Sequence, residues 1–343
     1  MRQYMGSIVG NERLTQKLCL DILAGRLAHA FIIEGKRGTG KHTLALNTAA
    51  ALACSAKDAT DSDVPCGTCP ECKKIFEGKS PDIITVGCEG KTTLGVDAVR
   101  FLKEDVHTAP NDLDFKLYII EDADKMTVQA QNALLLTLEE PPSFVRFILL
   151  CENADLLLET IRSRAPVLRT EPISNADVDE YICKNDRRAA QMKLSSTQEY
   201  NELLMAAKNG IGTALELLDP KTFAPIREMR RLAEDVVDNA TDGSGARRIF
   251  PLLSRFSQKR DVLAKQLACL SEAVNDLILI KKSDNAPLCF FADRDRAIEL
   301  CDRCSMSFLY ELGKAVLKAI DNNARNANVR LTLIKLMSDA SLI

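Results

Sequence analysis

Short apolar runs alternate with helical patterns along the first half of the chain. The runs cover residues 30–33, 83–86, 116–120 and 147–150, and β-branched or aromatic side chains contribute to each of them. Continuous apolar runs of this length are typical of strands that are buried on both faces of a parallel sheet. The pattern therefore predicts an α/β fold, with helices covering both sides of a parallel sheet.

Strand patterns stop at about residue 172, and helical patterns replace them. Residues 174–219 predict short helices, with Ser174, Asn175 and Asp177 as candidate caps. Beyond a polar stretch at 238–245, apolar residues recur at helical spacing. They are Leu263, Leu267, Leu270, Val274, Leu277 and Ile278, then Leu309, Leu312, Val316, Leu317 and Ile320. The C-terminal third is predicted to be all helical, with these stripes as core and a subunit interface as the alternative.

Composition narrows the class of protein. The 343 residues are 46% apolar, which is enough for several cores, and 45 basic against 48 acidic residues give a net charge of −3. A slightly acidic chain argues against a protein that wraps nucleic acid by charge. No apolar run reaches the ~18 residues that span a membrane, and the first residues lack a signal-peptide pattern. We therefore expect a soluble, cytoplasmic protein.

A glycine-rich loop, residues 35–43, lies between the first apolar run and the next predicted helix. The positions that correspond to a Walker A loop are Gly35, Gly38, Thr39, Gly40, Lys41, His42 and Thr43. In such a loop backbone N–H groups face phosphate oxygens, the helix start adds partial positive charge, and the lysine reaches the outer phosphates. The loop is predicted to bind ATP or ADP; a turn without a ligand is the alternative.

The predicted nucleotide site departs from a hydrolytic one at two places. A Ser or Thr that binds Mg²⁺ normally follows the lysine, whereas this chain has His42, and Thr43 would point elsewhere on the helix. After the run 116–120 the acids come as Glu121 and Asp122, the reverse of the Asp-Glu order that holds the metal and orients water. An error of about 1 Å can cost ~100-fold in rate. We predict nucleotide binding with weak or absent hydrolysis. Contact of Glu121 and Asp122 with Mg²⁺ stays an open alternative.

Twelve cysteines are many for a chain of this kind, and four of them have metal-ligand spacing. Cys66, Cys69 and Cys72 form a Cys-x₂-Cys-x₂-Cys run, and Cys54 lies upstream at the end of a predicted helix. Four thiolates can close a tetrahedral structural zinc site, and the run lacks the features of an iron–sulfur motif. We predict Zn²⁺, with free thiols as the alternative. The other eight cysteines, including the pair Cys301 and Cys304, are interpreted as small apolar fillers.

These features resemble a known family once residues 131–142 are added to them. The Walker A loop, the cysteine cluster directly after its helix and the sequence Gln-Asn-Ala-Leu-Leu-Leu-Thr-Leu-Glu-Glu-Pro-Pro resemble bacterial clamp-loader subunits of the AAA+ class. Within this family, residues 93–100 and 121–126 are most similar to subunits of the delta-prime type of DNA polymerase III. The resemblance implies an AAA+ P-loop domain at 1–172 with a zinc module at about 54–72, a helical lid at 173–222 and a helical collar at 223–343.

The resemblance also implies roles for three further positions. Ser163-Arg164 matches the Ser-Arg-Cys motif, whose arginine reaches into the neighbouring subunit's ATP site, although the third residue here is alanine. Asn153 matches the sensor 1 region, where a polar side chain faces the γ-phosphate. Gly212 aligns with the arginine that senses this phosphate in active motors. For Arg164 the alternative is a solvated arginine at a helix end.

The family resemblance implies a scaffold subunit within a hetero-pentamer of gamma/tau and delta subunits. That complex opens a sliding clamp and places it on primed DNA, and Arg164 would act in trans on a neighbour's ATP, an effect worth ~10³–10⁵ in rate. A gamma/tau motor ATPase is the main alternative, but it would carry an Asp-Glu pair, a Ser or Thr after Lys41 and the sensing arginine. A stand-alone zinc-containing NTPase is a further alternative.

Overall fold

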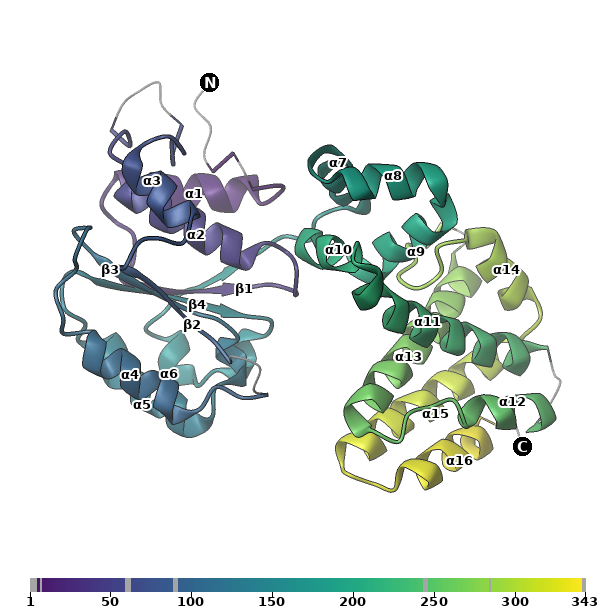
Figure 1. The fold of residues 1–343 in the computed structure, drawn as a ribbon. Helices are drawn as coiled ribbons and strands as arrows, with labels where there is room; N and C mark the ends of the chain where they lie inside the picture. The colour runs from purple at the N-terminus through teal and green to yellow at the C-terminus, as the bar shows by residue number, and fades with distance from the viewer. Residues whose placement is uncertain are drawn as a thin grey trace. The chain divides into compact units, whose positions relative to one another are not determined.

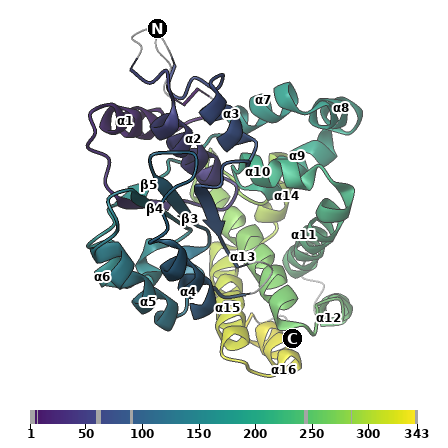
Figure 2. The same ribbon diagram turned by 60° about the vertical axis from the view of Figure 1, so that its left-hand side comes forward.

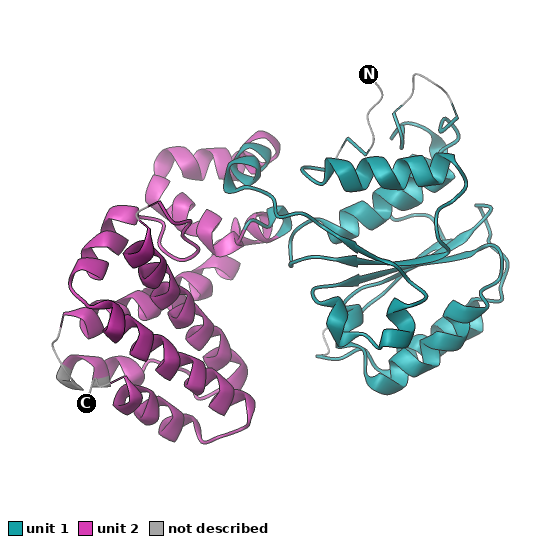
Figure 3. Cartoon of the chain, turned by 180° about the vertical axis from the view of Figure 1, so that it is seen from behind, with its two compact units in different colours: residues 1–181, 209–212 teal, residues 182–208, 213–343 magenta. Residues whose placement is uncertain are grey.

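Two compact units make up the chain. The computed structural model describes residues 5–6, 8–58, 63–88, 92–242, 246–283 and 285–340. Unit 1 comprises residues 1–181 and 209–212, and unit 2 comprises residues 182–208 and 213–343 (Figure 3). The division into P-loop, lid and collar domains at residues 172 and 222 stays a prediction.

Unit 1 is built on a five-stranded parallel sheet (Figure 1). The strands are β1 (Ala30–Glu34), β2 (Ile83–Val86), β3 (Lys116–Ile120), β4 (Val145–Cys151) and β5 (Val167–Arg169), in the spatial order β2-β3-β4-β1-β5. The apolar runs predict the first four strands. Strand β5 was not predicted, because its three residues end in arginine and leave almost no apolar run.

Helices cover both faces of this sheet, as the apolar runs predict. One face carries α1 (Glu12–Leu23), α2 (Lys41–Ala53) and α3 (Pro70–Phe76), and the other carries α4 (Val96–Asp105), α5 (Val128–Glu139) and α6 (Glu159–Arg162) (Figures 1 and 2). Successive residues of a strand point to opposite faces. Phe31 and Ile33 of β1 therefore pack under α2, whereas Ile32 packs with α4 and α5. Short 3₁₀ turns, η1 (Ala123–Lys125) and η2 (Ala154–Leu156), follow β3 and β4.

The rest of the chain is helical. The helices are α7 (Asn175–Asn185), α8 (Arg187–Ser195), α9 (Thr197–Ala207), α10 (Ile211–Leu217), α11 (Pro220–Thr241), α12 (Ala246–Leu253), α13 (Arg260–Lys282), α14 (Arg294–Asp302), α15 (Met306–Ala324) and α16 (Val329–Asp339). Helix α13 packs along α11 and α15. Most of the predicted stripe is core, but Leu317 is 60% exposed. Of the predicted polar break, residues 243–245 lie outside the described residues.

The longest helices are α11 and α13, and both carry charged residues along their length. Within the described ranges, no helix is long and apolar enough to cross a membrane.

Candidate nucleotide site and metal centre

The loop between β1 and α2 turns at glycines. Gly38 and Gly40 have φ angles of 77° and 83°, in the left-handed region that glycine adopts without strain. A Cβ added to Gly35 would lie 2.0 Å from the Thr170 hydroxyl oxygen. Thr39 is buried and donates its hydroxyl to a carbonyl of the loop at 2.8 Å. The sequence thus folds into the tight strand–loop–helix turn that a phosphate-binding loop requires.

Lys41 begins α2 and turns its ammonium group back into the loop. Its Nζ atom donates to the carbonyl oxygens of Gly35, at 2.6 Å, and Lys36, at 2.8 Å. Burial lowers the pKa of Lys41, and the negative charge of Glu152 opposes this shift. Thr43 lies exposed in the same helical turn. Because an ammonium group has three donors, Lys41 can exchange carbonyl partners for phosphate oxygens.

The two residues that depart from the hydrolytic pattern contact each other. His42 Nδ1 lies 2.7 Å from Glu121 Oε1, and the two side chains are 44% and 41% exposed. Asp122 adopts a φ of 50°, and its carboxylate pairs with Lys125 at 2.9 Å. Both predicted acids are therefore engaged by basic side chains.

The predicted sensor residue is used in a local cap. The side-chain oxygen of Asn153 accepts the N–H of Asp155 at 2.9 Å at the start of η2. Asp124 accepts the N–H groups of Glu152, at 3.0 Å, and Asn153, at 3.2 Å, and so ties the end of β4 to the turn after β3. The sequence shows Asp124 as an acid but gives no sign of this contact, which depends on the pairing of β3 with β4.

Gly212 lies directly against the phosphate loop. Its N–H donates to the Gly38 carbonyl at 3.0 Å, and an added Cβ would lie 3.4 Å from the Gly38 Cα atom. Both residues belong to unit 1. The structure therefore brings to the loop the position that aligns with the phosphate-sensing arginine, and that position carries no side chain.

Arg164 follows α6 and is held at the surface of unit 1. Its Nη2 atom lies 2.5 Å from Glu139 Oε1 at the end of α5, and the arginine side chain is 35% exposed. Its Nη1 atom donates to the Thr160 carbonyl at 2.8 Å and to the Ser163 hydroxyl at 3.3 Å. The Glu139 partner was not predicted, because the two residues are far apart in sequence. These partners of Arg164 belong to α5, to α6 and to the turn after α6, and none of the three is part of the phosphate loop.

The four predicted zinc ligands lie together between α2 and α3. The Sγ atoms of Cys54, Cys66, Cys69 and Cys72 are all within 4.8 Å of one another. Tetrahedral zinc, with Zn–S bonds of about 2.3 Å, holds its sulfurs about 3.8 Å apart. Cys54 and Cys72 are buried and the other two are half-buried; residues 59–62 of the connecting loop lie outside the described residues. The donor set and its spacing fit a structural zinc ion.

Hydrogen-bond donors surround the exposed side of this cysteine cluster. The Cys69 N–H approaches Cys66 Sγ, and the Cys72 N–H approaches Cys69 Sγ, each at 3.4 Å. Burial raises the pKa of Cys72. Burial would also raise that of Cys66, but hydrogen bonds from the Thr68 hydroxyl and from backbone N–H groups outweigh it and lower the pKa to about 6. Such donors stabilise the thiolate form that binds metal.

Cys301 and Cys304 have similar spacing but a different environment. The Cys301 thiol is buried and donates to the Leu277 carbonyl at 3.4 Å, and Cys304 is partly buried against the same core. This agrees with their interpretation as apolar fillers.

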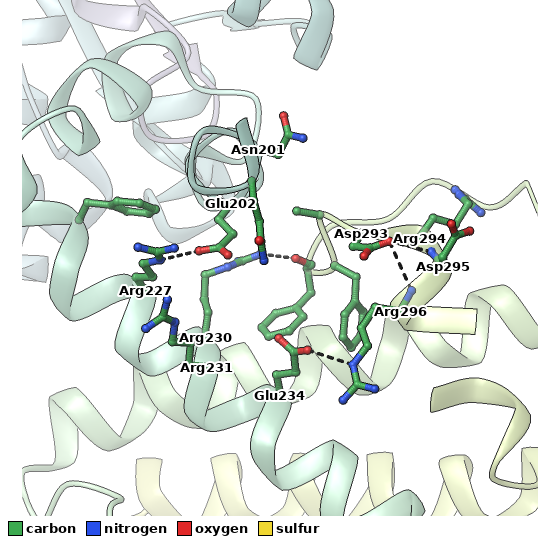
Figure 4. Close-up of a pocket in the computed structure, with 15 residues that line it drawn as sticks. Asn201, Glu202, Arg227, Arg230, Arg231, Glu234, Asp293, Arg294, Asp295 and Arg296 are labelled. Carbon is green, nitrogen blue, oxygen red and sulfur yellow. Dashed lines mark hydrogen bonds and ion pairs between the residues drawn. The ribbon is translucent and has the colours of Figure 1, made fainter. Parts of the chain in front are cut away.

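Unit 2 contains a cavity of about 780 Å³ between α9, α11 and the segment that leads into α14 (Figure 4). Arg227 pairs with Glu202 at 2.6 Å, and Arg296 forms a further pair across the cavity. Arg230 is buried; it donates to the Phe290 carbonyl and lies 4.5 Å from the centre of that ring. The charges of the cavity are matched largely within its own walls, so we interpret it as a packing feature of unit 2.

Comparison with known proteins bears on unit 1. Residues 10–174 match the family described as DNA polymerase III, delta subunit. The gamma subunit of DNA polymerase III from Buchnera aphidicola (subsp. Acyrthosiphon pisum, strain APS) is 32% identical over 219 residues, 63% of this chain and 58% of that protein. The delta′ subunit from Bacillus subtilis (strain 168) is 32% identical over 215 residues, 63% of this chain and 61% of that protein. A DNA polymerase III gamma subunit-related protein from Thermotoga maritima aligns with 95% of this chain and 98% of its own, at 18% identity and a TM-score of 0.49.

The range that matches the family, residues 10–174, includes the phosphate loop, the cysteine cluster and Arg164. The matched region spans about 60% of the length of these two curated relatives. Gamma and delta′ subunits match at the same 32% identity, so the sequence comparison does not distinguish these subunit types. Through residues 10–174, just under half of its length, the chain is therefore similar to subunits of DNA polymerase III.

Proposed function

We propose that the chain is a delta-prime-type subunit of the DNA polymerase III clamp loader. In this role it binds nucleotide but hydrolyses it weakly or not at all, and it assembles with gamma/tau and delta subunits into a hetero-pentamer. That complex places a sliding clamp on primed DNA. We expect the chain to work in the cytoplasm, where these partners would act.

One observation carries the proposal: the phosphate loop is intact while the positions for hydrolysis are changed. The glycine turns and Lys41 keep the geometry of a phosphate cradle. His42 and Glu121 pair with each other, and Gly212 brings only backbone to the loop. Phosphoryl transfer depends on positioned charge around the phosphate, so losing several such groups favours binding without turnover.

Arg164 is the residue proposed to act on a neighbour. It is held at the surface by Glu139 and by the turn after α6, with its guanidinium partly exposed. A guanidinium inserted into an adjacent ATP site stabilises the charge that develops on the transferred phosphoryl group. The arginine would have to exchange its Glu139 partner for that phosphate.

The remaining parts of the chain are proposed to be structural. Zinc held by the cysteine cluster would fix the loop between α2 and α3. The helices of residues 173–222 would form a lid domain, and those of residues 223–343 a collar that holds the ring together. The net charge of −3 favours protein partners and leaves DNA contact to more basic subunits.

The gamma/tau motor is the competing subunit type, and two measurements separate it from our proposal. Native mass spectrometry of the chain mixed with gamma/tau and delta subunits should show one copy within a pentamer. The chain alone should show negligible ATP turnover. Substantial turnover that Lys41→Ala abolishes would identify a motor and overturn the proposed role, and failure to join the complex would remove its basis.

A further inference from the structure

The contact between His42 and Glu121 has a consequence for metal binding. In hydrolytic sites with a Walker A loop the residue after the lysine offers a hydroxyl to Mg²⁺, and an acid at the end of another strand of the sheet faces the same ion. In this chain those positions hold an imidazole and a glutamate, and their Nδ1 and Oε1 atoms are 2.7 Å apart. Mg²⁺ requires near-octahedral oxygen ligands, and imidazole suits softer metals.

The fold makes room for this pair. Glu121 is fixed at the end of β3 by its N–H bond to the Val86 carbonyl at 2.8 Å. A Cβ added to Gly87 would lie 3.3 Å from Glu121 Oε2, so glycine at this position leaves space for the longer carboxylate side chain. Both members of the pair are nearly half exposed, and His42 directly follows Lys41 at the start of α2. The pair therefore lies directly beside the phosphate loop, with both side chains partly exposed.

The other acids after β3 are also occupied by protein donors. Asp122 pairs with Lys125 at 2.9 Å, and Asp124 accepts the N–H groups of Glu152 and Asn153. All three carboxylates that follow β3 are thus engaged. The residues present do not fit the Mg²⁺ that accompanies nucleotide in hydrolytic members of this class.

We propose that this loop binds a nucleoside di- or triphosphate without Mg²⁺, and that the His42–Glu121 pair takes the place of the metal. This rests on the nucleotide-binding part of the proposed function. A protonated imidazole has two N–H donors, one for Glu121 and one for a phosphate oxygen. The loop N–H groups, the start of α2 and Lys41 supply the remaining positive potential. Without a metal bridging the outer phosphates, the nucleotide is held as a structural ligand and is not turned over.

The test is isothermal titration of the full-length chain with ADP and with ATP, with excess magnesium and in magnesium-free buffer. Magnesium is removed by exchange and checked by elemental analysis, because a chelator would compete for zinc at the cysteine cluster. The expected dissociation constants differ by less than about threefold between the two buffers, well within one decade. Wild-type binding that is more than about tenfold tighter with magnesium would overturn the proposal.

The variant His42→Ser restores a hydroxyl, and we expect it to bind at least about tenfold more tightly with magnesium than without. Lys41→Ala should lose binding in both buffers. If His42→Ser folds but stays indifferent to magnesium, the pair does not replace the metal; should it fail to fold, the wild-type comparison still decides. Binding in neither buffer would refute nucleotide binding as a whole but not the action of Arg164 on a neighbour, which the reconstituted complex tests separately.

Discussion

Asp82 fixes the segment that leads into β3. The side chain is fully buried immediately before β2, and its carboxylate accepts the N–H groups of Asn111, Asp112 and Leu113 at 2.7 to 2.8 Å. Burial alone would raise the pKa of Asp82, but these backbone donors outweigh it and lower the pKa below its ordinary value. The folded protein therefore favours the charged form of this side chain.

Replacing this carboxylate should give a pH-dependent loss of stability. Hydrogen bonds to a charged group contribute about 1.5–3 kcal/mol, so Asp82→Asn should cost about 2 kcal/mol of unfolding free energy at pH 7. Because the folded-state pKa is lowered, this contribution is present above the unfolded-state pKa of about 3.9 and is lost as the pH falls through the folded-state value. Urea unfolding across pH should show the gap between the two proteins closing only in acid.

The matched control is Asp97→Asn, at an exposed carboxylate that pairs with Arg100 on the surface of α4. Surface pairs of this kind contribute about 0–1 kcal/mol, so stability should hardly change. A gap for Asp82→Asn that is the same at every pH would contradict the role given to its charge.

The elements α2 and α3 are joined through the cysteine cluster. Cys54 immediately follows α2, Cys69 caps α3 by accepting the Cys72 N–H, and both buried thiols belong to the core under these helices. A metal at this point would therefore fix the ends of two helices relative to the sheet.

Removing one ligand should release the metal and loosen these two helices. We expect one zinc per chain after native purification and little or none for Cys69→Ser. The cost should be a few kcal/mol, well below the ~10–16 kcal/mol of zinc binding to finger peptides, because the sheet keeps its own core. Elemental analysis, thermal unfolding and limited proteolysis of residues 54–72 would measure this. Cys289→Ser, at an exposed thiol, is the control, and a native protein without zinc would contradict the assignment.

Sequence pattern predicts the elements of unit 1 better than the contacts between them. Four strands are continuous apolar runs, whereas the three residues of β5 carry too little pattern. The phosphate loop and the zinc ligands are local in sequence, and the structure brings each group together as predicted. The pairs His42–Glu121 and Gly38–Gly212 could not be predicted, because strand order and the position of α10 create them.

At the scale of the whole molecule, each unit has its own core, and the proposed role gives each unit a contact with a partner subunit. Unit 1 holds Arg164 at its surface. Unit 2 leaves large apolar side chains exposed on its last two helices, where Leu317 is 60% and Leu331 is 66% exposed. In the proposed collar, these two leucines would contact a neighbouring subunit.

The measurement that tests the central claim most directly is single-turnover ATP hydrolysis by the reconstituted complex that contains Arg164→Ala. The control is Arg162→Ala, because this neighbouring arginine is also 35% exposed and pairs with Asp155 at 2.8 Å. We predict that both variants join the complex by native mass spectrometry. Arg164→Ala should slow ATP hydrolysis at the adjacent site by about 10³-fold or more, whereas Arg162→Ala should leave the hydrolysis rate of every site unchanged. Unchanged rates of ATP hydrolysis in a complex containing Arg164→Ala would contradict the proposed role of this arginine.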